Sequence, residues 1–197
     1  KKEEGETDSS EKVEKKKSEK KLEKKNPPLL YDTTALQVDA NNYYGFTLDQ
    51  TLKIAQSLYE HGFITYPRVD STYLTEDKKF EVPLLLEAII DSRFPQYKGR
   101  VKTNMPDRYF NDSKVSGHDA IIITDLTPSG LDEKQEKIYD LICRRMLMTV
   151  CPSMEVQKTV VTTSVGEEEF KTNGTILKQM GFMALNVKQR TVNNSEL

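Results

Sequence analysis

Residues 63–71 read FITYPRVDS and follow directly on a helical pattern. Within five residues this stretch carries the hydroxyl of Tyr66, the guanidinium of Arg68 and the carboxylate of Asp70. A neutral tyrosine, with a pKa near ~10, is a poor nucleophile, so an enzyme that uses one needs nearby cations. Pro67 holds φ near about −65° and lacks an N–H, which stiffens the backbone between tyrosine and arginine. The stretch predicts a nucleophile and a cation aimed into one cleft, although local chemistry alone favours a surface turn with a half-buried ring.

Helix signals precede this stretch. Asp32 or Thr33 can cap a first helix that runs to about Tyr43 and stops at Gly45. A Thr-x-x-Gln capping box then opens a second helix, which ends at Gly62 and delivers the chain to the tyrosine. The box is Thr47 and Gln50, and the apolar face of this helix holds Leu48, Leu52, Ala55, Leu58 and Tyr59.

Further helices and then strands are predicted downstream. Thr75 can start one helix, Pro83 can occupy the first turn of another, and residues 133–150 show the longest helical pattern. This last helix turns Ile138, Leu141, Ile142 and Met146 inward, and Arg144 and Arg145 are interpreted as charges at its C-terminus. Beyond Pro152 the pattern changes to strands at 156–165 and 169–178, around a turn at 165–168. We therefore predict an α+β fold, mainly helical with about six helices, followed by β-strands.

Charge and composition limit the classes of function. Residues 1–26 hold ten lysines and eight acidic residues, a mixed-charge leader for which disorder is expected to about Ser10. The rest of the chain has 19 basic and 23 acidic residues, whereas a free-standing duplex binder is normally basic. No signal peptide or apolar run near ~18 residues points to export or a membrane. Cys143 and Cys151 are expected to be buried free thiols rather than a disulfide or a metal site.

Six motifs in a fixed order carry a family resemblance. They read LYDTTALQ at 30–37, AN at 40–41, GF at 45–46, TLKIAQSLYE at 51–60, ITYPRVDS at 64–71 and GHDAIIIT at 117–124. The set resembles the active-tyrosine region of type IA DNA topoisomerases, most of all the bacterial topoisomerase III group. The resemblance runs from about Pro27 to the C-terminus.

The resemblance implies a chemistry and roles for individual residues. Enzymes of this family cleave single-stranded DNA through a 5′-phosphotyrosine link, pass a strand and religate without ATP. By motif, Tyr66 is the nucleophile, Arg68 stabilises the transition state at the scissile phosphate, and His118 binds the phosphate near the cleaved bond. Such a division of labour suits phosphoryl transfer, in which positioning and cations do most of the catalysis. Candidate DNA contacts are Thr65, Asp70, Ser71, Lys53 and Gln56.

The resemblance also implies a division into domains. Residues 27–152 correspond to the helical tyrosine domain, and residues 153–197 to strands of an incomplete gate domain, with an edge strand of that domain at 13–25. The family binds Mg²⁺ in a Toprim domain, which has no counterpart here. We therefore expect an excised piece that is inactive alone, has single-stranded DNA and other domains of the same polypeptide as partners, and comes from a cytoplasmic, nucleoid-associated bacterial enzyme. Its oligomeric state stays open.

Two positions depart from the family pattern. The residue after the arginine is usually a small hydroxyl residue and here is Val69, so any hydrogen bond from that hydroxyl is absent. The histidine motif commonly ends in Pro-Thr and here ends in Ile123-Thr124. We expect both to be tolerated, because the nucleophile, the arginine and the histidine remain.

Other interpretations remain open. A tyrosine recombinase or type IB enzyme places its Arg and His before the tyrosine, whereas here Arg68 and His118 follow it. A non-catalytic DNA- or protein-binding module on the same scaffold would have no need of all three side chains. His118, taken alone, could cap a helix beginning at residues 119–122.

Overall fold

The computed structural model describes residues 14–165 and 168–187. It divides into two compact units, a sheet and a helical unit. The helical unit contains Asn26–Ser153 together with the segment that begins at Gly181. The predicted disorder to about Ser10 and the middle of the turn at 165–168 lie outside the described residues.

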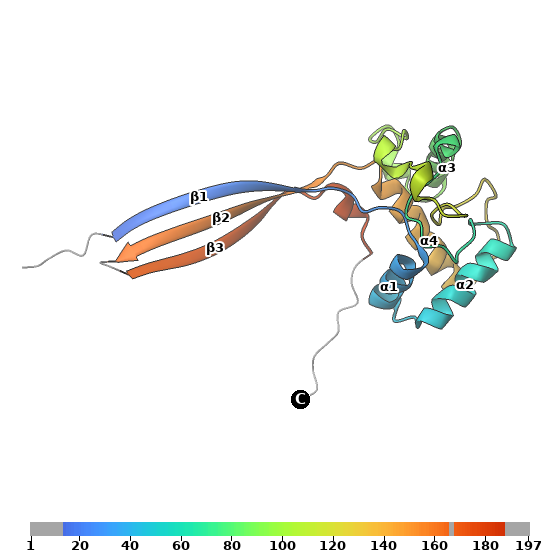
Figure 1. Cartoon of the computed structure of the whole chain (residues 1–197), viewed down its shortest axis with the longest axis horizontal. Helices are drawn as coiled ribbons and strands as arrows, with labels where there is room; N and C mark the ends of the chain where they lie inside the picture. Colours follow the sequence, from blue (N-terminus) through green and yellow to red (C-terminus); the bar gives the residue numbers. More distant parts are fainter. Residues whose placement is uncertain (1–13, 166–167, 188–197) are drawn as a thin grey trace, which may run out of the picture. The chain divides into compact units, whose positions relative to one another are not determined.

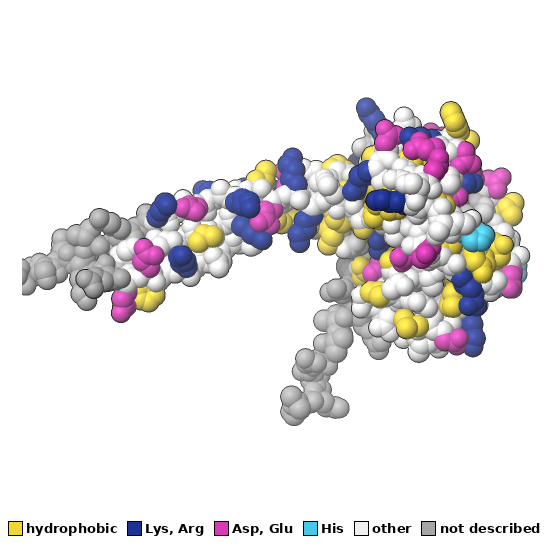
Figure 2. Space-filling view, in the orientation of Figure 1, with side chains coloured by type: hydrophobic (Ala, Val, Ile, Leu, Met, Phe, Trp, Pro, Cys, Tyr) yellow, Lys and Arg dark blue, Asp and Glu magenta, His cyan; other side chains and the backbone are white. Residues whose placement is uncertain are grey.

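The sheet unit is an antiparallel three-stranded sheet in the order β1-β2-β3, and its strands run side by side in Figure 1. The strands are β1 (Glu14–Lys25), β2 (Met154–Val165) and β3 (Glu168–Gln179). Basic and acidic side chains are interspersed along the face shown in Figure 2. Two pairs link β1 with β2, Lys24 with Glu155 at 2.7 Å and Glu23 with Lys158 at 2.9 Å. The polar strand predicted over 13–25 and the two strands predicted after Pro152 are thus confirmed in the described residues.

The helical unit is built around α4, which contacts the other three helices. The helices are α1 (Thr33–Tyr44), α2 (Leu48–Glu60), α3 (Val82–Arg93) and α4 (Glu133–Met148). The four predicted inward positions of α4 are all buried at 2% exposure or less. Both cysteines are free and buried, as expected, and burial raises the pKa of Cys143 to about 12 and that of Cys151 to about 11. Nowhere in the described ranges is there a helix both long and apolar enough to span a bilayer.

The helix ends follow the predicted signals. Asp32 is the N-cap of α1 and accepts the N–H of Ala35 at 2.6 Å, and Gly45 closes the helix with φ of 71°. Thr47 and Gln50 form the reciprocal capping box of α2 at 3.0 and 3.1 Å. A second capping box at the start of α4, between Asp132 and Gln135, was not among the predictions.

Removing the Thr47 hydroxyl by Thr47→Ala should lower the free energy of unfolding by about 1 kcal/mol, because one N–H of the first turn of α2 loses its acceptor. Urea unfolding followed by helical circular dichroism measures this. Thr47→Ser keeps the hydroxyl and should stay within a few tenths of a kcal/mol of the parent chain. Equal stability of the alanine and serine variants would contradict the capping role.

The prediction of about six helices was too high, since the described residues contain four α-helices. The helix expected at Thr75 is a single 3₁₀ turn, Glu76–Lys79. The amides at its start, those of Thr75 and Glu76, donate to the carboxylates of Asp119 and Asp112. After β3 the chain leaves the sheet, and Gly181–Leu185 forms a 3₁₀ helix that contacts α4.

Candidate active site

The candidate site lies on the loop that follows α2, and Gly62 turns the chain into it. Gly62 has φ of 77°, a value that side-chain-bearing residues rarely adopt. A Cβ there would also lie 2.9 Å from the Leu126 side chain. The N–H of Phe63 donates back to the carbonyl of Leu58 at 2.9 Å, which closes the end of α2. The glycine stop predicted from the sequence thus sets the direction in which the loop leaves.

One flank of the loop is bound to the extended segment 120–124. Ile64 forms an antiparallel bridge with Ile123, and both are buried. The N–H of Thr65 donates to the carbonyl of Ile122 at 2.9 Å. The hydroxyl of Thr65 donates to the carbonyl of Ala120 at 3.1 Å and accepts the N–H of Ile122 at 3.0 Å. This hydroxyl therefore serves the attachment of the loop.

The other flank is bound to the first residue of α1. The N–H of Thr33 donates to the carbonyl of Val69 at 3.0 Å. The hydroxyl of Thr33 lies 2.7 Å from the carbonyl of Pro67 and 2.8 Å from the nitrogen of Val69. The side chain of Val69 is itself buried, at 8% exposure. The loop is thus tied to the protein both before and after Tyr66.

The ring of Tyr66 is half-buried and contacts two aromatic side chains. Its centroid lies 4.7 Å from that of His118, with the planes at 46°. Tyr59, at the end of α2, makes an edge contact with the same ring, with the centroids 5.3 Å apart and the planes at 74°. The structure therefore brings together two of the three predicted catalytic side chains, from motifs that lie far apart in the sequence.

Arg68, the third predicted catalytic residue, is exposed. Within the described part of the chain its guanidinium has neither an ion-pair nor a hydrogen-bond partner. The backbone carbonyl before it and the N–H after it are both held by Thr33. An arginine with a fixed backbone and a guanidinium unpaired among the described residues can bind a phosphate that approaches from solvent.

The remaining candidates differ in what they offer to a ligand. Asp70 is exposed, and its carboxylate accepts from the hydroxyl of Ser116 at 3.1 Å. Ser71 is buried at 4% exposure, with its hydroxyl bonded to backbone atoms of Tyr73 and Lys114. On α2, Lys53 pairs with Asp49 at 2.8 Å and Gln56 bonds Glu60 at 3.1 Å.

The interpretation of His118 as a helix cap is wrong. Residues 119–122 are not helical, because their backbone pairs with two other segments. Ile121 bridges to Tyr31, and the N–H of Ala120 donates to the carbonyl of Tyr73 at 2.9 Å. The carboxylate of Asp119 accepts the N–H of Thr75 at 2.6 Å. These ties place His118 at the start of an extended segment beside the Tyr66 loop.

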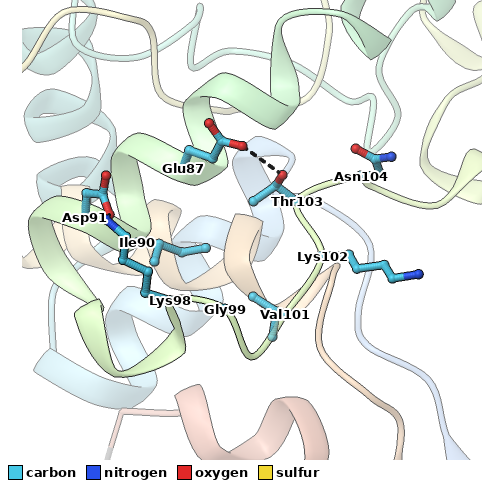
Figure 3. A pocket seen from close by; sticks show the side chains of 9 residues that line it. All are labelled: Glu87, Ile90, Asp91, Lys98, Gly99, Val101, Lys102, Thr103 and Asn104. Carbon is cyan, nitrogen blue, oxygen red and sulfur yellow. Dashed lines mark hydrogen bonds and ion pairs between the residues drawn. The ribbon is translucent and has the colours of Figure 1, made fainter.

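Two other features of the unit contribute nothing to this site. A cavity of about 530 Å³ lies between α3 and residues 98–104 and contains none of the predicted site residues. Its polar groups are partly paired, Glu87 with Thr103 at 3.3 Å and Asp91 with Lys98 at 2.8 Å (Figure 3). In the described ranges no three His, Cys, Asp or Glu residues gather into a group that could hold a metal ion.

Comparison with known proteins identifies the class to which this fold and loop belong. The family described as DNA topoisomerase matches residues 2–197, and the chain belongs to this family. Within it the chain is type IA and topoisomerase III-like. It is 39% identical to DNA topoisomerase 3 of Bacillus subtilis (strain 168) over 173 residues. This alignment covers 84% of this chain and 24% of that protein. DNA topoisomerase 3 of Bacillus cereus (strain ATCC 14579) is 38% identical over 170 residues, 83% of this chain and 23% of that protein.

A solved structure is also similar. Full-length topoisomerase I from Thermotoga maritima matches with a TM-score of 0.61 and 26% identity, over 92% of this chain and 30% of that chain. The chain thus spans about a quarter of the length of the curated relatives it matches.

Sequence reasoning missed two residues of the site. Tyr59 was assigned to the apolar face of its helix, yet its ring touches that of Tyr66. Thr33 was considered only as a helix cap, a role that Asp32 fills. For Tyr59 a signal did exist, because an aromatic residue in the last turn of a helix faces the segment that folds back after the glycine stop.

Proposed function

We propose that Tyr66 is the DNA-cleaving nucleophile of a type IA topoisomerase that breaks and reseals one strand of DNA. The observation that carries the proposal is the contact of the Tyr66 and His118 rings, 4.7 Å apart, on a loop tied to the protein on both flanks. Membership of the DNA topoisomerase family supports it. A non-catalytic module would have no physical need of this arrangement.

The proposed reaction is a reversible exchange of phosphodiester bonds. The phenolic oxygen of Tyr66 forms a bond to phosphorus while the bond from phosphorus to the 3′ oxygen breaks. The phenol loses its proton and the departing 3′ oxygen gains one. Arg68 would stabilise the charge that develops on the phosphate oxygens, and His118 would bind the phosphate near the cleaved bond. Because one phosphodiester replaces another, resealing by the 3′ hydroxyl needs no ATP.

Other parts of the chain receive roles within the same proposal. We infer that β1–β3 belong to the gate domain and that residues 27–152 form the tyrosine domain. Mg²⁺ would be held by a Toprim domain outside these residues. Of the candidate DNA contacts, Asp70, Lys53 and Gln56 each bond one other side chain at the surface. The hydroxyls of Thr65 and Ser71 instead bond backbone atoms of neighbouring segments.

Replacing Arg68 by alanine should slow cleavage by about 10²-fold, the range observed when one preorganised donor is removed from a transition state. Affinity for single-stranded DNA should change much less, because the guanidinium acts on charge that develops during the reaction. Single-turnover cleavage and DNA titration of the full-length parent measure the two quantities. Arg100→Ala removes another exposed arginine and serves as the matched control. Equal losses of rate and affinity in both variants would point to general charge attraction instead.

The test of the proposal is to map the covalent adduct. The full-length parent is trapped on a single-stranded oligonucleotide with Mg²⁺, and the attached peptide is identified by mass spectrometry. A 5′-phosphotyrosyl adduct on Tyr66 is expected. A 3′ adduct would support the recombinase class. A DNA-binding parent that forms no adduct would support the non-catalytic module.

A further inference from the structure

The first residue of α1 has a side chain that the helix does not use. Asp32 caps α1 and accepts the N–H of Ala35, so the hydroxyl of Thr33 is free for another purpose. Thr33 is half-buried and its hydroxyl faces the loop of Tyr66, more than 30 residues away along the chain. The neighbouring Thr34 is exposed and has no side-chain hydrogen bond to any described residue.

The hydroxyl of Thr33 bonds the residues on either side of Arg68. It accepts the N–H of Val69 at 2.8 Å. Its single proton can go to the carbonyl of Pro67 at 2.7 Å or to that of Val69 at 2.9 Å. The shorter distance favours the Pro67 carbonyl as its acceptor, while the Val69 carbonyl accepts the N–H of Thr33 at 3.0 Å. One side chain therefore fixes the peptide units that lead into and out of Arg68.

The loop cannot supply this attachment itself. Pro67 has no N–H to donate, and Val69 has no hydroxyl. The Val69 side chain is buried, which leaves its backbone N–H in a site where an unpaired donor costs free energy. Thr33 satisfies that N–H and, through the same atom, sets the direction in which the Arg68 side chain leaves the backbone.

We propose that Thr33 is a positioning residue, which acts on DNA cleavage by holding Arg68 through the Thr33 hydroxyl's bonds to Pro67 and Val69. The proposal rests on the proposed function of Tyr66 and Arg68. A small misplacement of a catalytic group can cost up to about 10²-fold in rate without loss of the fold. Loss of the Thr33 hydroxyl should therefore slow cleavage more than it weakens DNA binding, in addition to the stability lost when the Val69 N–H is left unpaired.

The test uses Thr33→Val in the full-length parent, since valine keeps the β-branched shape and replaces the hydroxyl by a methyl group. We expect the single-turnover cleavage rate to fall by about tenfold or more. Affinity for a single-stranded oligonucleotide should change by less than about twofold, because ground-state contacts are retained. Thr33→Ser keeps the hydroxyl and should cleave at nearly the parent rate. Thr34→Val, the matched control, should cleave like the parent.

A double variant separates positioning from general stability. If Thr33 acts through Arg68, Thr33→Val should cause little further loss in an Arg68→Ala background. The proposal would be overturned if the rate loss of the double variant equalled the product of the two single losses. An unchanged rate in Thr33→Val would also overturn it. Thr33→Ala tests the same loss of the hydroxyl should the valine variant fold poorly, and the Asp32 cap keeps the start of α1 in both.

Failure of this inference can be distinguished from failure of the proposed function. If the unaltered parent forms no 5′ adduct on Tyr66, the proposed function fails and this inference fails with it. If the adduct forms and Thr33→Val cleaves at the parent rate, only the role of Thr33 is refuted.

Discussion

Tyr66→Phe in the full-length parent is expected to abolish covalent attachment to DNA. Only the phenolic oxygen is removed, and that atom is the proposed nucleophile. Loss of an enzymatic nucleophile costs on the order of 10⁶-fold in rate, so neither a trapped adduct nor relaxation of supercoiled DNA should be detectable. Adduct formation on a labelled single-stranded oligonucleotide measures the first, and a plasmid relaxation assay measures the second.

The same variant should keep its fold. The ring contacts with Tyr59 and His118 are retained, and the Tyr66 hydroxyl has no hydrogen-bond partner among the described residues. The free energy of unfolding should therefore change by no more than about 0.5 kcal/mol. Tyr97→Phe removes a hydroxyl from a half-buried tyrosine in the turn after α3 and should leave cleavage intact. Relaxation at the parent rate by Tyr66→Phe would refute the assignment of the nucleophile.

Arg145→Met should lower the free energy of unfolding by about 2 kcal/mol, between the values for an exposed and for a buried ion pair, because the pair with Asp39 is partly buried. The Arg145 side chain is 14% exposed and pairs with Asp39 at 2.5 Å. It also donates to the carbonyl of Leu29 at 3.1 Å and stacks over the Tyr31 ring at 4.0 Å. Burial raises the pKa of Tyr31, so its phenol stays protonated and still donates to Asp39 at 2.7 Å, but this neutral group does not balance the charge of the carboxylate. Urea unfolding of the chain measures the loss.

Two further variants test the cause of that loss. Asp39→Asn combined with Arg145→Met leaves no unpaired charge beside Tyr31 and should recover part of the stability. Arg100→Met removes an exposed arginine and should change the free energy of unfolding by less than about 0.5 kcal/mol. A loss below about 1 kcal/mol for Arg145→Met would show that solvent compensates for the missing pair.

The features that the sequence predicted correctly depend on short-range bonds. Asp32 caps α1 through Ala35, and Thr47 caps α2 through Gln50, so each signal and its partner lie three residues apart. Helix starts, helix stops and the inward face of α4 follow from such local patterns. The prediction that Tyr66 and His118 act at one site came from the family motifs, because no local pattern links two residues so far apart in the sequence.

The features that the sequence did not predict depend on long-range partners. Arg145 was interpreted as a charge at a helix C-terminus, but its partners Asp39 and Leu29 lie 106 and 116 residues away. The helix expected after Thr75 is a single 3₁₀ turn, and the amide of Thr75 donates to Asp119, 44 residues on. Thr33 reaches the loop across 34 residues. A hydroxyl or a carboxylate has many candidate partners in a sequence, and only the folded chain selects one.

The two attachments of the Tyr66 loop have a mechanical consequence. Thr65 fastens the backbone before the tyrosine to the 120–124 segment, and Thr33 fastens the backbone after it to α1. A pulling force on the phenolic oxygen would be resisted by both attachments. It would therefore act on the buried core and would not extend the loop. A DNA end joined to this oxygen could move little relative to the helical unit. The DNA end would therefore move together with that unit.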